Sequence, residues 1–103
     1  MRLPFSLQQA LEALLTQPGE TTSSLRREIL ERNRFGSGSV PEDIQPLVDK
    51  IAHQPWSVND QDFDRLRAAG HSDGQLYDIT LAAALGAALR RFDAGLRAID
   101  EAS

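Results

Sequence analysis

The chain has 103 residues, of which 41% are hydrophobic and 25% are charged, and its formal net charge at pH 7 is −4. This length and composition fit a single globular domain, residues 1–103, that buries roughly two thirds of its unfolded surface. The charges are dispersed, with six basic and seven acidic residues up to Ser57 and five basic and eight acidic residues after it. The dispersion argues against a nucleic-acid partner, because such a surface requires a basic stripe.

The sequence contains no cysteine, which excludes a disulfide framework, a thiolate nucleophile and a cysteine-ligated metal. The start of the chain makes a poor signal peptide, because Gln8, Gln9 and Glu12 interrupt its apolar residues. No apolar run approaches the length of a membrane span. We therefore expect a cytoplasmic protein without a membrane partner, and no pattern predicts a cofactor.

The first predicted helix begins at a capping box, in which the Ser6 hydroxyl accepts from the Gln9 amide and the Gln9 side chain reaches back. Its apolar face consists of leucines at helical spacing, Leu7, Leu11 and Leu14. The Pro18-Gly19 pair ends it.

A second predicted helix, 25–34, follows a Thr/Ser cluster at 21–24 that offers several N-caps. Its apolar face is thin, and Glu28 and Arg32 are spaced for a surface ion pair. Residues 35–39, Phe-Gly-Ser-Gly-Ser, have the most flexible composition of the chain and are the best candidate boundary.

The third predicted helix runs from Pro41 to about His53, and Pro55 ends it. One face carries the apolar side chains Ile44, Leu47, Val48 and Ile51. Pro46 lacks the N–H for a helical hydrogen bond, so we expect a kink or a later start.

Asn59 predicts the cap of a fourth helix, with Val58 and Phe63 as a hydrophobic staple. Gly70 supplies the left-handed residue that ends this helix.

The fifth helix begins at a capping box formed by Ser72 and Gln75, with His71 at a staple position. Its pattern continues to about Asp100, and Gly86 is the only weak point. No segment alternates with period two, and no internal repeat is visible. We therefore predict an all-α bundle of five helices with the long last helix as its central element.

The last helix is apolar on two opposite faces. One face, the leucine seam, carries Leu81, Leu85, Leu89, Phe92, Leu96 and Ile99. The opposite face, the small-residue stripe, carries Leu76, Thr80, Ala83, Ala87, Ala94 and Ala98. Two apolar faces favour one neighbour inside the subunit and one outside it, which predicts a homo-oligomer. The predicted interface comprises Thr80, Ala83, Ala87, Arg91 and Ala94. The alternative is a monomer whose four shorter helices cover both faces.

The segment VNDQDFDRLRAAGHSDGQLYDITLAAALGAALRRFDAGL resembles the C-terminal half of the alkylhydroperoxidase AhpD-like, or carboxymuconolactone decarboxylase-like, superfamily. In that superfamily, an aspartate-rich helix ends in Gly and is followed by Ser, an acid and a long Ala-rich helix with an Arg near its middle. The matching residues here are Asp60, Asp62, Leu66, Gly70, Ser72, Asp73, Leu76, Leu81, Ala82 and Arg91. The likeness covers about 41–99, so residues 41–100 form the AhpD-like module and 1–36 an N-terminal region of unclear role. The resemblance implies an all-α fold and self-association as dimers, trimers or larger rings.

Redox members of this superfamily carry a Cys-x-x-Cys pair followed by His, and use it as a peroxidatic and resolving dithiol. Neither thiol exists here, so the dithiol peroxidase mechanism is excluded. The helix that would bear the motif is replaced by the N-terminal region.

Three residues are candidates for chemistry. Asp49 precedes His53 by four residues, a spacing at which a carboxylate orients an imidazole for acid/base catalysis. The simpler interpretation of His53 is an exposed histidine near a helix C-terminus, where the dipole favours it. Arg91 lies beside the small-residue stripe, in position to pair with a carboxylate or an anion. His53 and His71 are far apart in sequence, so no metal site is predicted.

Two further side chains have expected partners. Asp78 lies in line with the leucine seam, and we expect a salt bridge to Arg65 or Arg67, with a ligand site as the alternative. Trp56 is expected to fill the corner between two helices, or alternatively to line a pocket mouth.

The sequence thus supports three hypotheses about function. In the first, the chain is a non-catalytic AhpD-like structural or interaction protein that forms a homo-oligomer, with another protein as a further candidate partner. In the second, it is a cysteine-free enzyme of the decarboxylase or lactone type, in which His53, Asp49 or Arg91 handles a small carboxylate. A third hypothesis is a protein that binds a small molecule without turnover. A His and an Arg converging in a cavity would favour the enzyme.

Overall fold

The computed structural model describes residues 3–102, and over this range the chain is all-helical without a strand. The helices are α1 (Phe5–Thr16), α2 (Ser23–Phe35), α3 (Gln45–His53), α4 (Asp60–Ala68) and α5 (Asp73–Ala102). A single 3₁₀ turn, Pro55–Ser57, joins α3 to α4. The predicted all-α fold with a long C-terminal helix is confirmed.

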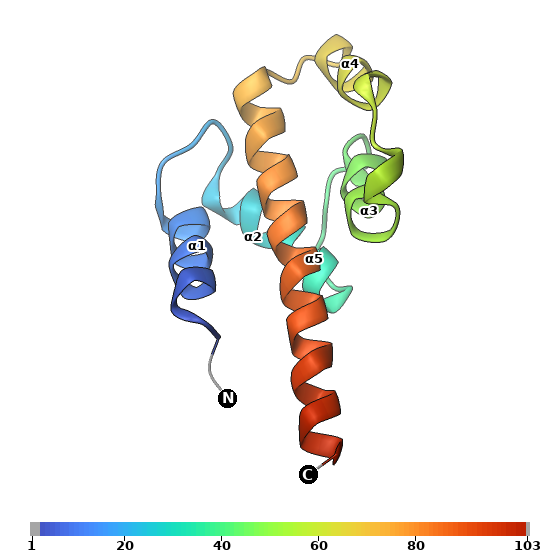
Figure 1. The fold of residues 1–103 in the computed structure, drawn as a ribbon. Coiled ribbons are helices and arrows are strands. Elements are labelled where there is room, and N and C mark those ends of the chain that lie inside the picture. Colours follow the sequence, from blue (N-terminus) through green and yellow to red (C-terminus); the bar gives the residue numbers. More distant parts are fainter. Residues whose placement is uncertain (1–2, 103) are drawn as a thin grey trace.

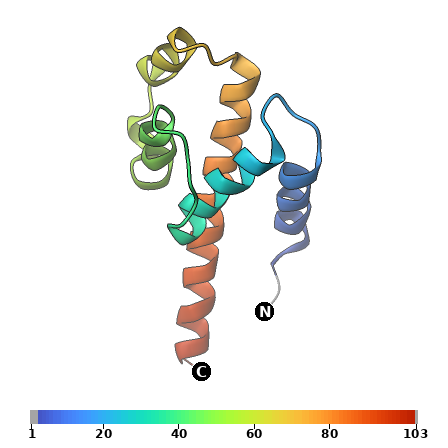
Figure 2. The same ribbon diagram turned by 180° about the vertical axis from the view of Figure 1, so that it is seen from behind.

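Helix α5 is the axis of the molecule. Figure 1 shows α1 on one side of it and α3 and α4 on the other, with α2 behind it, and Figure 2 shows α2 crossing in front of α5 when the molecule is seen from the opposite side. In both views the last turns of α5 extend beyond the other helices. The molecule measures 51 × 29 × 21 Å, because a helix of 30 residues is about 45 Å long and sets the long dimension.

Gly86 does not break α5; it is the point at which α2 comes closest. A Cβ built on Gly86 would lie 2.5 Å from the carbonyl oxygen of Leu30 in α2. Only a residue without a side chain allows the two backbones to approach this closely. Gly86, which the sequence pattern marks as a weak point of the helix, is therefore required for the packing of α2 against α5.

Helix α2 is the hub of the core, although its sequence shows only a thin apolar face. Ile29 and Leu30 are 0% and 4% exposed, and the side chains of Arg26 and Asn33 are buried with them. The Asn33 amide nitrogen donates to the carbonyl oxygens of Val48 in α3 and Ala83 in α5, both at 3.0 Å. One polar side chain thus joins three helices.

The start of the first helix differs from the sequence-based expectation, whereas the starts of the second and third agree with it. Helix α1 begins at Phe5, and its cap position, Pro4, makes no side-chain capping bond, so the predicted Ser6 capping box is wrong. Thr22 caps α2 by accepting from the Leu25 amide. Helix α3 begins only at Gln45, which agrees with the predicted later start around Pro46.

The corner between α4 and α5 forms as predicted. Asn59 caps α4, and Gly70 has a φ of 105° in the left-handed region. The Gly70 and His71 amides donate to carbonyls in the last turn of α4, which closes the helix with a Schellman motif. Ser72 and Gln75 form both bonds of the capping box that starts α5.

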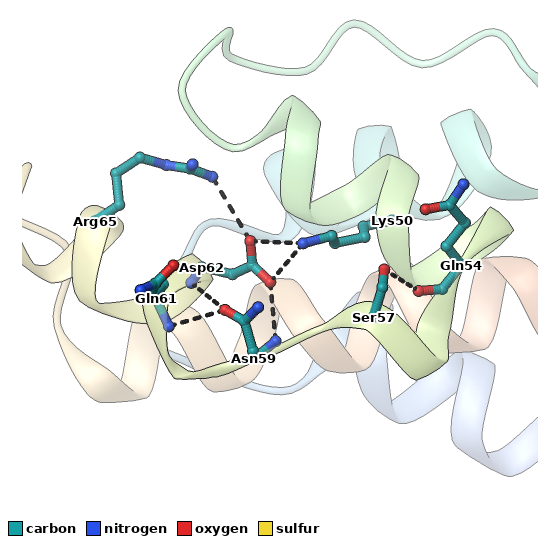
Figure 3. A network of polar contacts seen from close by, with 7 residues as sticks. All are labelled: Lys50, Gln54, Ser57, Asn59, Gln61, Asp62 and Arg65. Atoms are coloured by element: carbon teal, nitrogen blue, oxygen red, sulfur yellow. Dashed lines mark hydrogen bonds and ion pairs between the residues drawn. The ribbon is translucent and has the colours of Figure 1, made fainter.

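A polar network fixes α4 against α3 (Figure 3). The Asp62 carboxylate accepts from the Asn59 amide at 2.9 Å and from the Lys50 ammonium at 3.0 Å, and Arg65 lies 4.0 Å away. The Asn59 amide first, and then Lys50, hold the pKa of Asp62 below its usual range, because both bonds favour the ionised carboxylate. Asp62 therefore caps its own helix and ties that helix to α3.

Candidate functional site

The structure brings two of the three catalytic candidates together. His53 at the end of α3 and Arg91 in α5 line one surface hollow of about 210 Å³, together with Arg90 and alanines of both helices. His53 and Arg91 are both exposed to solvent. The hollow is thus a shallow, positively charged surface between two helices.

The third candidate, Asp49, is engaged elsewhere. Its two carboxylate oxygens accept from Nε and Nη2 of Arg32 at 2.8 and 3.0 Å. This bidentate bond is the main reason that the pKa of Asp49 lies below its usual range. Asp49 therefore ties α3 to α2 and does not orient His53 as a catalytic dyad requires. The ion pair expected between Glu28 and Arg32 is replaced, because Arg32 binds Asp49 and Glu28 accepts from the Ser39 amide.

The predicted oligomer interface is not available as a whole. Ala83 and Ala87 are 0% and 5% exposed, because this part of the small-residue stripe packs inside the subunit. Thr80 is half-buried, whereas Arg91 and Ala94 are exposed. The small residues allow the chain's own helices to approach α5. The prediction that Ala83 and Ala87 lie in an oligomer interface is therefore wrong, because both belong to the core of the subunit.

The leucine seam is divided between two environments. Leu89 is fully buried, whereas Leu81 near the start of α5 is 45% exposed and Ile99 near its end is 54% exposed. Phe92 and Leu96 are half-buried. Large apolar side chains thus remain at the surface on the part of α5 that extends beyond the bundle.

Phe35 at the end of α2 adds to this apolar surface. It is 62% exposed, and the Arg34 guanidinium lies over its ring at 4.9 Å from the centroid. Arg34 also forms a bidentate ion pair with Asp93 of α5, at 2.9 and 3.1 Å. We call the surface formed by Phe35, Phe92, Leu96 and Ile99 the C-terminal patch. Of these four residues, Phe35 and Leu96 line a hollow of about 480 Å³.

Three other side chains have partners or positions that the sequence did not predict. Asp78 accepts from the amide and hydroxyl of Thr21, both at 3.0 Å, so the predicted salt bridge to Arg65 or Arg67 is wrong. His71 contacts the Asp43 carboxylate at 2.6 Å. Trp56 is 81% exposed and fills no corner.

Residues 3–102 contain no cluster of three or more histidine or acidic side chains arranged to hold a metal ion. Within the same range, none of the helices combines the length and hydropathy needed to cross a lipid bilayer. Comparison of the chain with protein-family models, curated proteins and solved structures gave no match.

Proposed function

We propose that this chain is a non-catalytic helical interaction module of the AhpD-like type that forms a homo-oligomer through the C-terminal patch, in the cytoplasm. One observation carries the proposal: the end of α5 extends beyond the bundle, with Ile99 exposed and Phe92 and Leu96 half-buried at its surface. Phe92, Leu96 and Ile99 are spaced four and three residues apart, as in a helix that packs along another helix. Exposed apolar side chains gathered in this way are typical of association surfaces.

The charges around the patch favour a second copy of the chain as the partner. A two-fold interface places a surface against the same surface of a second copy. A rim whose charges all had one sign would therefore repel the rim of that copy. Here the rim carries both signs, with Arg34, Arg90 and Arg97 beside Asp93 and Asp100. The patch is therefore compatible with its own copy.

The ion pair between Arg34 and Asp93 prepares the patch for binding. It fixes the end of α2 to α5, and the stacked guanidinium holds the Phe35 ring in place. Two elements that are far apart in sequence thus present one surface before any partner arrives. Such preorganisation lowers the entropy lost on association.

The test is the molar mass in solution, measured by size-exclusion chromatography with light scattering from about 1 µM to about 1 mM. The wild-type protein should reach the mass of a dimer or higher oligomer within this range. Leu96→Glu places a charge at the centre of the patch and should give a monomer whose circular dichroism matches the wild type.

The matched control is Ala98→Glu, which adds the same charge to the same helix on an exposed face away from the seam. It should associate like the wild type. A wild-type protein that stays monomeric throughout, or a Leu96→Glu variant that still associates, refutes the proposal.

A second candidate function rests on the hollow shared by His53 and Arg91. In this alternative, the chain is a cysteine-free enzyme of the decarboxylase or lactone type, with Arg91 binding a small carboxylate and His53 moving a proton. Hydrolysis of γ-butyrolactone by the wild type and by His53→Gln, followed with a pH indicator, tests the lactone activity. Equal rates for the two proteins would eliminate His53 as the catalytic group.

A further inference from the structure

A second cavity lies between α1, α2 and the first half of α5, away from the C-terminal patch. Its volume is about 270 Å³, near the lower end for small-molecule sites. Leu14 of α1 and Leu81 and Leu85 of α5 form apolar walls, and Arg26 and Asp78 are its charged lining residues. Helix α1 packs mainly on α2, so the space next to α5 remains partly unfilled. We call this space the α1–α5 cleft.

Arg26 is the unusual component of the cleft. The residue is only 5% exposed, and its Nη2 donates to the Gln17 carbonyl at 2.7 Å. Its Nε is buried and has no hydrogen-bond partner. Within residues 3–102, no carboxylate forms an ion pair with this guanidinium. A buried cation with an unused donor is unfavourable unless an acceptor reaches it.

Asp78 does not supply that acceptor. Its Oδ2 accepts from the Thr21 amide and hydroxyl, which anchors the loop that follows α1. The same loop passes over both charged groups at Gly19, where a Cβ would lie 2.5 Å from Nη1 of Arg26 and 2.6 Å from Oδ2 of Asp78. The loop is thus built closely around Arg26 without satisfying its Nε.

We propose that the α1–α5 cleft binds a small carboxylic acid with an apolar body, up to about ten non-hydrogen atoms in all. The carboxylate pairs with Arg26, and the apolar body lies against Leu14, Leu81 and Leu85. A carboxylate is the acceptor that forms the strongest hydrogen bonds with a guanidinium, and it compensates the buried charge. Burial of the apolar body adds a favourable contribution proportional to its area. This site goes beyond the proposed self-association, which uses other residues.

The test compares three probes with the same body: hexanoate, hexanamide and hexylamine. Binding is measured by titration with ¹H–¹⁵N correlation spectra, which locate the perturbed amides as well as giving the affinity. Hexanoate should perturb amides of α1, α2 and the first half of α5. It should bind about tenfold more tightly than hexanamide, because a charged acceptor on a buried guanidinium contributes about that factor. Hexylamine should bind least.

Variants assign the roles of the two charged groups. Arg26→Gln should remove the preference for hexanoate over hexanamide, whereas Arg27→Gln, at the exposed neighbouring arginine of α2 outside the cleft, should leave it unchanged. Asp78→Asn keeps an oxygen for Thr21 and removes a negative charge near the ligand, so hexanoate should bind as tightly as before or more tightly. Ala13→Phe fills the cleft from α1 and should abolish binding while Arg26 stays in place. If Arg26→Gln fails to fold, the loss of hexanoate binding in Ala13→Phe tests whether the cleft is the binding site.

Three results would overturn the proposal. Equal affinity for hexanoate and hexanamide would mean that Arg26 does not recognise the carboxylate. Stronger binding of hexylamine would show that Asp78 governs the cleft. Absence of any shift in α1, α2 and α5 up to about 10 mM hexanoate would show that the cleft has no affinity for this class of ligand.

Discussion

Gly86→Ala should destabilise the protein, although alanine is the better helix former. The added Cβ would lie 2.5 Å from the Leu30 carbonyl oxygen and 3.0 Å from the Cβ of Asn33. The first of these atoms belongs to the α2 backbone, so no side-chain rotation relieves the contact. The crossing of α2 over α5 must open instead.

Two opposing effects set the magnitude. Replacing glycine by alanine inside a helix stabilises by about 1 kcal/mol. Overpacking a close contact costs about 1–3 kcal/mol, and opening the crossing also strains the Asn33 bond to the Ala83 carbonyl. We expect a net loss of about 1–2 kcal/mol, since the contact is with backbone. For a domain of this size, each 1 kcal/mol lowers Tm by about 4–8 °C.

The assay is urea unfolding followed by circular dichroism, with Gly95→Ala as the matched control. Gly95 lies in the same helix, and a Cβ there has no atom within 4 Å. Gly95→Ala should therefore raise the free energy of unfolding by up to about 1 kcal/mol. If Gly86→Ala proved as stable as Gly95→Ala, the close approach of α2 to α5 at this position would be disproved.

Two further changes test the polar contacts of the core. Asn33→Leu removes two hydrogen bonds to α3 and α5 at nearly constant volume, and should lower the free energy of unfolding by about 1–3 kcal/mol in urea titrations. The pKa of Asp62 is lowered in the folded state, so its stabilisation is complete above the unfolded pKa of about 3.9 and is lost as the pH falls through the folded pKa. Asp62→Asn should therefore flatten the decline of stability between about pH 5 and pH 2, and an unchanged slope would contradict its role. Asp49→Asn should have a smaller effect at neutral pH, because the Asp49 side chain is 44% exposed and that of Asp62 only 10%.

The sequence correctly predicts the features of the fold that depend on contacts between residues close together in the chain. Asn59, Gly70, Ser72 and Gln75 act at the positions that their types indicate, because caps and left-handed turns depend on local backbone geometry. The length of α5 follows from the same local information. Ser6 is the exception, since the cap position of α1 is Pro4, two residues earlier than the capping pattern indicates.

The sequence does not predict which face of α5 is buried, because that depends on where α2 crosses it. Its pattern offers large side chains on one face and small ones on the other. The buried glycine and alanines allow α2 to approach, so the internal face lies between the two predicted faces and includes Ala83 and Ala87 of the stripe as well as Leu89 of the seam. A polar residue, Asn33, then completes the core by bonding carbonyls distant in sequence. No periodicity in the sequence reports such long-range contacts.

At the candidate sites too, the sequence predicts the spacing of residues within a helix but not their contacts with other helices. Asp49 and His53 have the spacing of a dyad, but Arg32 from another helix takes the carboxylate. Arg26 has no sequence signal, because an arginine in an amphipathic helix is ordinarily exposed. Its burial follows from α1 and the loop at Gly19, which cover it.

The two ends of the leucine seam, on either side of the buried Leu89, interact with what lies outside the core. Leu81 and Leu85 line the cleft under α1, whereas Phe92, Leu96 and Ile99 lie on the C-terminal patch, with the fully buried Leu89 between them. Because α5 is one unbroken helix, a change at one end leaves the residues at the other end in place unless the whole fold is lost. The two proposals therefore predict independent outcomes. Leu96→Glu should abolish association and retain the preference for hexanoate over hexanamide, whereas Arg26→Gln should remove that preference and retain association. If either variant lost both properties while keeping its helical spectrum, the seam would act as one coupled surface, and the separation proposed here would be wrong.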